Sequence, residues 1–212
     1  MKIIPTHFNP ALIFWYLKFT PALCGDQAKS TENKLMDLEQ IYKNGIIGAG
    51  GAGFPTHIKL KTRPELLIMN AAECEPLLHK DIQLLWNYSD EVLNGFQIAM
   101  EFCGASQAII GIKRKHQKVI NLLQQKISNK IRIKAIDDFY PAGDEVTLVY
   151  ETTGRLIQPG KLPISEGCLV QNVETLLNIA RNQPVVEKYL TIGGAVKEPL
   201  TIKVPVGITY KE

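Results

Sequence analysis

Cysteine is scarce in this sequence of 212 residues, and the few cysteines stand far apart. No pair has the C-x-x-C spacing that marks many iron–sulfur and zinc sites, so we expect no iron–sulfur cluster within this chain. Isolated thiols are typical of a reducing compartment, which favours a cytoplasmic location. The four residues concerned are Cys24, Cys74, Cys103 and Cys168.

A strong excess of one charge is also missing. The formal net charge is +3, and Lys and Arg are spread along the chain except for the cluster "KRKHQK" at 113–118. Such a short run more often begins a solvated helix face than binds a polyanion. We therefore expect no nucleic-acid partner.

Long apolar runs are lacking near the N-terminus, where a targeting or membrane segment would be sought. The run "ALIFWYL" at 11–17 is ended by Lys18 and Pro21, whereas a membrane span needs roughly 20 apolar residues. "PALCG" superficially resembles a lipoprotein cleavage site, but Lys2 is the only basic residue before the apolar run. We expect residues 1–35 to be an N-terminal extension, disordered or added by a misplaced start.

From Met36 onward, segments of helical and strand character alternate. Helical spacing of apolar residues predicts helices, and Ser89 is expected to cap a further helix that ends at Gly104. This alternation predicts an α/β layered fold with a largely parallel sheet. The other expected helices are 35–44, 116–127, 144–154 and 172–182, and the expected strands are 65–70, 107–112, 130–136, 189–194 and 200–207.

The richest local pattern is "NGIIGAGGAGFPTHIKLK" at 44–61, in which five glycines fall between Gly45 and Gly53. The spacing formally matches G-x-G-x-x-G, which by itself is weak evidence for a dinucleotide fold. Only a short apolar stretch precedes the loop, and Pro55 and Pro64 leave room for about two turns of helix behind it. A Rossmann crossover normally uses a longer helix, so that fold is the weaker interpretation.

Two interpretations of this loop stay open from the residues alone. Glycines let backbone N–H groups approach an anion closely, and Lys59 could add a positive charge. A tight turn that only packs explains any single glycine equally well. The residues therefore leave open whether the loop binds a phosphate.

Four motifs in order carry a resemblance to a known family. They are "GAGGAGFPTHIKL" at 48–60, "NAAECEPLLHKD" at 70–81, "YPAGDE" at 140–145 and "VQNVETLLNIA" at 170–180. Together they resemble the flavoprotein family that includes the NADH-binding flavin subunit of respiratory complex I and the RnfC component of the Rnf complex. Within it, the motifs look most like those of the cobalamin reductase of propanediol-utilisation microcompartments.

The resemblance implies a non-covalently bound FMN held by residues of all four motifs. It also implies NADH as the electron donor, with Phe54 beside the nicotinamide. Acidic residues of the second motif could bind a ribose or an amide, although carboxylates that only line a helix N-terminus are common. The implied cofactor-binding residues are Gly48, Gly50, Gly51, Gly53, Phe54, Lys59, Asn70, Glu73, Glu75, Tyr140, Gly143, Asp144, Glu145, Asn172 and Thr175.

Some positions depart from the family pattern on the nicotinamide side. Complex I flavin subunits have an acidic residue where this chain has Ala72, and aromatic residues where it has Leu60 and Thr62. FMN is therefore better supported than NADH. Gln171 replaces an asparagine of those subunits, a milder change that could shift one flavin contact.

The resemblance also predicts the domain organisation. It implies an FMN-binding α/β domain at 36–186, followed at 187–212 by the start of a small β domain. Longer relatives continue into cysteine-rich iron–sulfur segments, so we expect this sequence to be a fragment or a truncated product. Such a chain needs an electron-acceptor protein, such as an iron–sulfur partner, or a corrinoid, and reaches a membrane only through a partner complex.

Two classes of function follow. In the first, the chain is the flavin module of an NADH-dependent oxidoreductase, in the cytoplasm or inside a bacterial microcompartment. In the second, the fold is kept as a nucleotide-binding or assembly module without turnover. Reduction of a bound flavin by NADH distinguishes the two classes.

Overall fold

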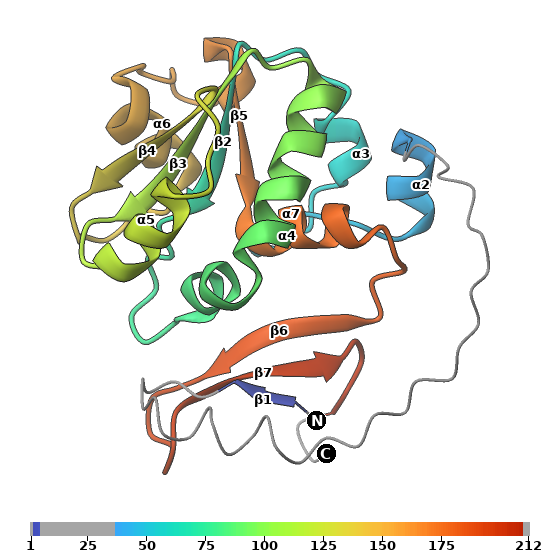
Figure 1. Ribbon diagram of the computed structural model, residues 1–212, viewed down its shortest axis with the longest axis vertical. Coiled ribbons are helices and arrows are strands. Elements are labelled where there is room, and N and C mark those ends of the chain that lie inside the picture. The colour runs from blue at the N-terminus through green and yellow to red at the C-terminus, as the bar shows by residue number, and fades with distance from the viewer. Residues whose placement is uncertain (1, 5–36, 210–212) are drawn as a thin grey trace.

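The computed structural model describes residues 2–4 and 37–209 and places their strands in two sheets (Figure 1). The larger sheet has four parallel strands in the order β4-β3-β2-β5. The α/β fold with a parallel sheet that the sequence predicts is thereby confirmed. Its strands are β2 (Leu66–Ala71), β3 (Gln107–Lys113), β4 (Ile131–Ile136) and β5 (Cys168–Asn172).

Strand β2 lies inside the sheet, between β3 and β5. The chain continues from β2 to β3 and β4 on one side and later returns to the other side of β2 to form β5. Leu66 is paired with Gln107 of β3 on one side and with Cys168 of β5 on the other. The residues of β2 are buried along almost its whole length, which explains its continuous apolar sequence. The gap between the carboxyl ends of β2 and β5 is a topological switch point, where open α/β sheets bind their ligands.

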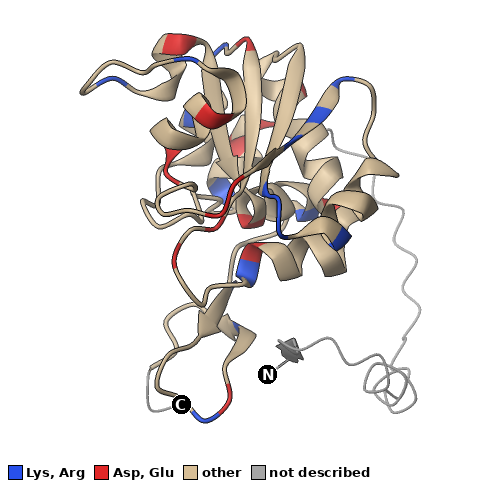
Figure 2. Ribbon diagram, turned by 90° about the vertical axis from the view of Figure 1, so that its left-hand side faces the viewer, with Lys and Arg blue, Asp and Glu red and all other residues tan. Residues whose placement is uncertain are grey.

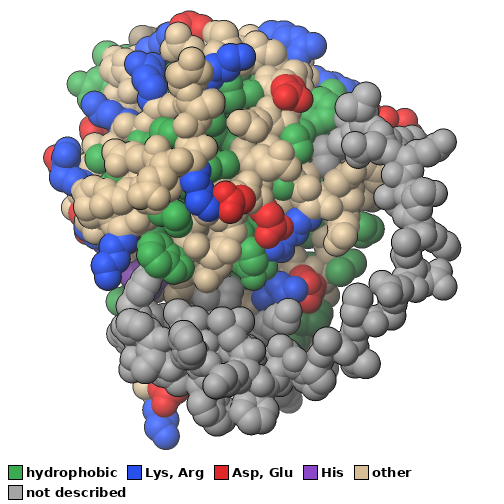
Figure 3. Space-filling model, in the orientation of Figure 1, with side chains coloured by type: hydrophobic (Ala, Val, Ile, Leu, Met, Phe, Trp, Pro, Cys, Tyr) green, Lys and Arg blue, Asp and Glu red, His purple; other side chains and the backbone are tan. Residues whose placement is uncertain are grey.

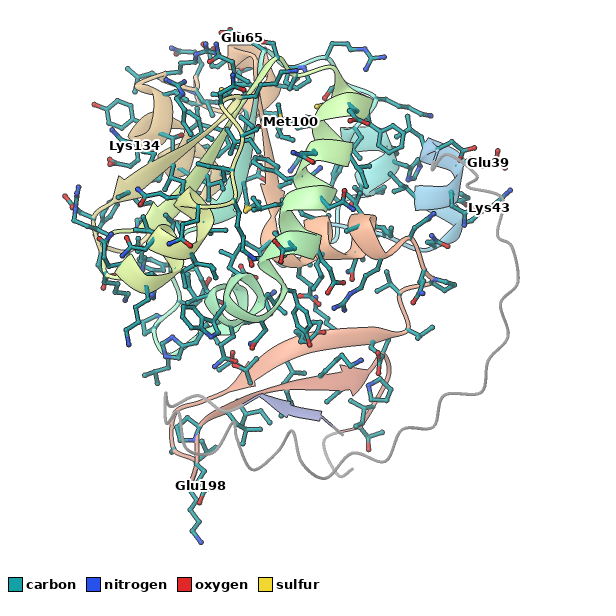
Figure 4. The ribbon with its side chains drawn as sticks, in the orientation of Figure 1. Glu39, Lys43, Glu65, Met100, Lys134 and Glu198 are labelled. Atoms are coloured by element: carbon teal, nitrogen blue, oxygen red, sulfur yellow. The ribbon has the colours of Figure 1, made fainter. Side chains whose placement is uncertain are left out.

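Helices cover both faces of this sheet. α4 (Lys80–Cys103), α5 (Gln117–Gln124) and α7 (Val173–Arg181) share one hydrophobic cluster with the sheet, and α6 (Glu145–Thr153) packs in a second cluster. Met100 of α4 belongs to the first cluster and is labelled between helix and sheet in Figure 4. The shorter helical segments are α2 (Leu38–Lys43), α3 (Thr56–Lys59) and the 3-10 turn η1 (Pro163–Glu166).

The predicted start of the long helix at Ser89 is wrong. α4 already begins at Lys80, and the helix is kinked at Tyr88, whose φ of −132° and ψ of 31° are not helical. The side chain of Ser89 accepts a hydrogen bond from Lys126 Nζ at 3.0 Å instead of capping the helix. The local pattern identified the segment after the kink and missed the turns before it.

The second sheet lies beyond the carboxyl ends of the parallel strands (Figure 1). β6 (Glu187–Ile192) pairs antiparallel with β7 (Leu200–Pro205), which also pairs with β1 (Lys2–Ile4). Figure 4 shows Glu198 at the far tip of the β6–β7 connection and Glu65 at the opposite end of the molecule, where β2 begins. Both predicted C-terminal β segments are confirmed, and the domain boundary at 187 stays a prediction.

Charged residues of both signs are interspersed over the ribbon in Figure 2 and over the face shown in Figure 3. Several of them form ion pairs, for example Lys113 and Lys115 with Asp138. These two lysines come from the "KRKHQK" cluster and share the one carboxylate of Asp138. In the described part of the chain, no helix combines the length and apolar character that crossing a membrane requires.

Candidate functional site

A cavity of about 910 Å³ opens at the carboxyl edge of the parallel sheet, at the switch point between β2 and β5. The glycine loop, the residues that follow β2, the 140–145 segment, the end of β5 and part of β6 form its wall. All the site residues that the sequence predicts line this cavity except Thr175. They are Gly48, Gly50, Gly51, Gly53, Phe54, Lys59, Asn70, Glu73, Glu75, Tyr140, Gly143, Asp144, Glu145 and Asn172.

The glycine loop is closed at its base and anchored to the fold. Ile47 forms an antiparallel bridge with Pro55, and the Gly48 N–H donates to the Phe54 carbonyl at 2.8 Å. Gly51 and Gly53 have φ values of +115° and +63°, a region that favours glycine. The short helix α3 follows, one turn of four residues, so the long helix of a Rossmann crossover is absent at this position.

The tip of the glycine loop offers hydrogen-bond donors. Within the described residues, the backbone N–H groups of Gly50, Gly51, Ala52 and Gly53 donate no hydrogen bond to another group of the protein. Gly50, Gly51 and Ala52 are exposed, so these N–H groups are open to solvent or to a ligand, and successive N–H groups in a turn can form an anion-binding concavity. The loop can therefore receive an anionic ligand without losing internal hydrogen bonds.

Thr175 supports this loop from behind. Its side chain is fully buried in α7, and its hydroxyl accepts a hydrogen bond from the Ala49 N–H at 2.9 Å. The same hydroxyl donates to the Ile47 carbonyl at 3.5 Å. Thr175 thus belongs to the predicted site, but it contacts the loop and does not line the cavity.

The second motif joins β2 to the 140–145 segment. Asn70 Nδ2 donates to the Gly143 carbonyl at 2.8 Å, and Asn70 Oδ1 accepts from the Ala72 N–H at 3.1 Å. A side chain at Gly143 would not fit, because a Cβ built there lies 2.6 Å from the Ala72 carbonyl oxygen. This close approach explains the glycine and holds one wall of the cavity in place.

Helix N-termini converge on the cavity, and side chains cap them. Asp144 accepts from the N–H groups of Val146 and Thr147 at the start of α6. Asn172 accepts from the Glu174 N–H at the start of α7. Because these caps already use the first N–H groups of the two helices, the glycine loop is the better place for an anion.

Carboxylates outnumber cations around the cavity. Lys59 forms an ion pair with Glu145 at 2.8 Å, and Lys80 pairs with the buried Glu174 at 2.8 Å. The Lys80 ammonium also lies 3.5 Å from Asp81 Oδ1. Both lysines are therefore already engaged by carboxylates, so neither is a free cation for a ligand.

Burial and charge shift the acid–base properties of this group. Burial, followed by repulsion from Asp81, raises the pKa of Glu73 to about 7. Burial also raises the pKa of Asp81, although attraction to Lys80 and a hydrogen bond from Asn172 Nδ2 at 2.7 Å oppose that shift. Burial lowers the pKa of Lys80, but Asp81 and Glu174 outweigh it, so its pKa is raised overall.

The carboxylate of Glu73 has a structural role as well as a place in the cavity wall. Its Oε2 accepts a hydrogen bond from the Asp81 N–H at 3.2 Å, in the first turn of α4. The alternative considered from the sequence, a carboxylate at a helix N-terminus, thus describes Glu73 correctly. Glu75 also lines the cavity, and its Oε2 lies 3.9 Å from Cys74 Sγ.

Several wall residues were not selected from the sequence. Lys80 and Asp81 stand inside the quoted second motif, so that motif could have indicated them. The residues from β6 carried no such sequence pattern, because only tertiary packing brings that strand to the cavity. The additional lining residues are Ala49, Ala52, Cys74, Leu78, Lys80, Asp81, Pro141, Val170, Gln171, Tyr189, Leu190 and Thr191.

The wall suits a flavin mononucleotide in size and chemistry. Pockets of roughly 300–1,000 Å³ hold ligands of this class, and the glycine loop supplies donors for a phosphate. Gln171 lines the same cavity, and its buried Nε2 has no hydrogen-bond partner among the described residues. Phe54 and Tyr140 are exposed at 46% and 72%, so two aromatic rings are accessible to a flat ligand.

A parallel sheet with a glycine loop and a polar cavity at its switch point defines a nucleotide-binding α/β domain. Comparison with protein families makes this more specific. The model described as "Nuo51 FMN-binding domain" matches residues 41–181. The chain belongs to this family, and its module is of the electron-transfer flavoprotein type found in oxidoreductase subunits.

Curated relatives and solved structures agree with that assignment. The chain is 44% identical over 178 residues to cobalamin reductase PduS of Salmonella typhimurium, covering 82% of this chain and 40% of the relative. It is 37% identical over 182 residues to a component of the proton-translocating ferredoxin:NAD(+) oxidoreductase complex of Clostridium ljungdahlii, covering 81% and 40%. The chain thus spans about 40% of the length of these relatives.

Among solved structures, an NAD+-reducing [NiFe]-hydrogenase in its H2-reduced state is similar, with a TM-score of 0.70 and 27% identity. The similarity covers 81% of this chain and 37% of that chain. The family resemblance drawn from the four motifs is confirmed by these comparisons. The roles of the individual site residues stay predictions.

Proposed function

We propose that this chain is the flavin module of an NADH-dependent electron-transfer oxidoreductase, with FMN bound in the cavity at the β2/β5 switch point. The observation that carries the proposal is the set of partnerless N–H groups at Gly50–Gly53, on the wall of a cavity of about 910 Å³. FMN, when bound, accepts a hydride and passes on single electrons, which suits transfer from NADH to a one-electron acceptor.

The chain's own residues divide the binding task. The glycine loop donates hydrogen bonds to the phosphate, while Asn70 and Glu73 stand at the end of β2, beside the rest of the ligand. Phe54, close to the loop and exposed, borders the nicotinamide. The acceptor is an iron–sulfur protein or a corrinoid, as the names of the relatives suggest, and the working compartment is the cytoplasm or a bacterial microcompartment.

The variant Gly50→Ala tests the phosphate site without disturbing the fold. A Cβ at Gly50 lies 3.8 Å from its nearest neighbour, Asn172 Cβ, and the backbone there does not need a positive φ. The added methyl group stands next to the Gly50 N–H, one of the proposed phosphate donors, and would crowd a phosphate bound there. We expect the thermal midpoint of the ligand-free protein to stay nearly unchanged and FMN affinity to fall by about tenfold, roughly 1.4 kcal/mol.

Gly193→Ala is the matched control, since its Cβ would also make only ordinary contacts and Gly193 does not line the cavity. FMN binding is followed by quenching of flavin fluorescence, and anaerobic visible spectra are recorded before and after NADH. Loss of the oxidised-flavin absorbance supports the oxidoreductase. Flavin that stays oxidised favours a nucleotide-binding module without turnover. A wild-type chain that binds no flavin refutes the flavin module and leaves an assembly module or a site for another nucleotide.

A further inference from the structure

The backbone of Ala49, directly before Gly50, is held from two helices through its N–H and its carbonyl. The Ala49 N–H donates to Thr175 Oγ1 of α7 at 2.9 Å, and the Ala49 carbonyl accepts from Lys80 Nζ of α4 at 3.4 Å. Neither Thr175 nor Lys80 belongs to the loop, and both are buried or nearly so, with 12% of the Lys80 side chain exposed. The loop backbone is therefore fixed at the residue where its free N–H groups begin.

The geometry of the Ala49–Gly50 peptide bond fixes the direction in which the Gly50 N–H points. The Ala49–Gly50 bond is trans, because the only cis peptide bond in the described residues joins Tyr140 to Pro141. In a trans peptide the C=O and the following N–H point to opposite sides of the chain. A carbonyl turned to Lys80 therefore turns the Gly50 N–H away from Lys80, and this N–H is free of protein acceptors among the described residues.

The Lys80 side chain is itself tightly oriented. Its ammonium bonds Glu174 Oε2 at 2.8 Å, and Glu174 Oε1 accepts the Tyr189 N–H of β6 at 3.0 Å. Only 2% of the Glu174 side chain is exposed. One buried ion pair thus ties the glycine loop, α4, α7 and the β6 wall of the cavity to each other.

We propose that Lys80 and Thr175 are positioning residues that orient the N–H groups of the glycine loop toward the phosphate of a bound flavin nucleotide. This inference rests on the proposed function. Both residues then act on the ligand through the loop backbone. Thr175 thereby has a different role from the direct cofactor contact that the family resemblance implies. As a consequence, both residues strengthen binding of the phosphate and have little influence on the affinity for the rest of the flavin.

Paired titrations with FMN and riboflavin, which lacks the phosphate, test this consequence on the full chain. Thr175→Val keeps the shape of the side chain and removes the hydrogen bond to Ala49. We expect its FMN affinity to fall by about tenfold, while its riboflavin affinity changes less than about twofold. Thr152→Val is the matched control, because the Thr152 hydroxyl bonds only helix α6, at the carbonyls of Leu148 and Val149.

The lysine is tested in two variants, because Lys80→Met alone leaves the carboxylates of Glu174 and Asp81 buried without their cation. The double variant Lys80→Met/Glu174→Gln removes the Glu174 charge together with its cation, and its thermal midpoint measured without ligand checks that the protein is folded. Lys126→Met, which breaks the ion pair with Asp90 outside the cavity, is the control. We again expect the affinity for FMN to fall while the affinity for riboflavin stays nearly unchanged.

The neutral Thr175→Val variant separates orientation of the loop from direct attraction of Lys80 for a phosphate. If it weakens FMN and riboflavin equally, or changes neither, the positioning role is overturned. Equal wild-type affinities for FMN and riboflavin also overturn it, because the loop then does not bind the phosphate, although flavin binding stands. A wild-type chain that binds neither ligand refutes the proposed function itself.

Discussion

Helices α4 and α7 approach each other very closely at Gly95 of α4. A Cβ built on Gly95 would lie 1.9 Å from the carbonyl oxygen of Leu176 and 3.2 Å from the Ala180 backbone nitrogen, both in α7. Real Cβ atoms almost never approach another atom within 3.0 Å. Gly95→Ala therefore forces α4 and α7 apart by about 1.1 Å at this point, because backbone atoms cannot rotate out of the way.

The magnitude follows from two opposing effects. Overpacking a well-packed core costs about 1–3 kcal/mol, and more where backbone must move. Alanine is favoured over glycine inside a helix by about 1 kcal/mol, which offsets part of that cost. We expect a net loss of about 2 kcal/mol in the free energy of unfolding, or roughly 4–8 °C in the thermal midpoint for a chain of this size.

Urea unfolding followed by circular dichroism measures this loss. Asn94→Ala is the control, because the neighbouring Asn94 is exposed on the same helix and gains the helix propensity without the contact. The shift also carries Thr175 away from Ala49, since both Leu176 and Thr175 lie in the first turn of α7, so FMN affinity falls as well. A Gly95→Ala protein as stable as Asn94→Ala would refute this packing argument.

Two further predictions concern the cavity wall. Because the folded state raises the pKa of Glu73 from 4.5 to about 7, the folded protein binds more protons than the unfolded chain between these values, and stability falls as pH rises through that window. Unfolding free energies at pH 5 to 8 should show that Glu73→Gln removes a slope of up to about 1.4 kcal/mol per pH unit, and an identical slope in the variant would contradict the assignment. Gly143→Ala places a Cβ 2.6 Å from the Ala72 carbonyl and strains the bond from Asn70. It should lower the free energy of unfolding by about 1–3 kcal/mol and weaken FMN binding. Unchanged melting and binding would contradict this prediction, because the cavity wall would then accommodate the added methyl group without strain.

Local periodicity predicted most of the parallel sheet. β2, β3 and β4 are short apolar or alternating runs bounded by turn residues, and α5 and α7 show clear helical spacing. β5 was missed, because its five residues "CLVQN" end in two polar side chains. Those polar residues stand at the carboxyl end of the strand, where Gln171 and Asn172 line the cavity, so the site itself obscured the strand pattern.

The start of α4 shows a second limit of local patterns. The first turns of α4 are separated from the rest by the kink at Tyr88, and a polar serine follows it. The local pattern predicts a helix cap at this serine, although tertiary contact with Lys126 satisfies its hydroxyl. Such partners lie too far along the chain for any short window to include them.

The sequence by itself determined the fold class, the family and about half of the residues that line the cavity, because ordered motifs encode backbone features such as the glycines of the loop. Only the tertiary structure decided how those residues divide into wall and support. Lys80 and Glu174 are 94 residues apart, and their ion pair exists because the fold brings α4 and α7 together at the switch point. Burial in that junction, which no sequence spacing reports, also moves the pKa of Glu73 to about 7.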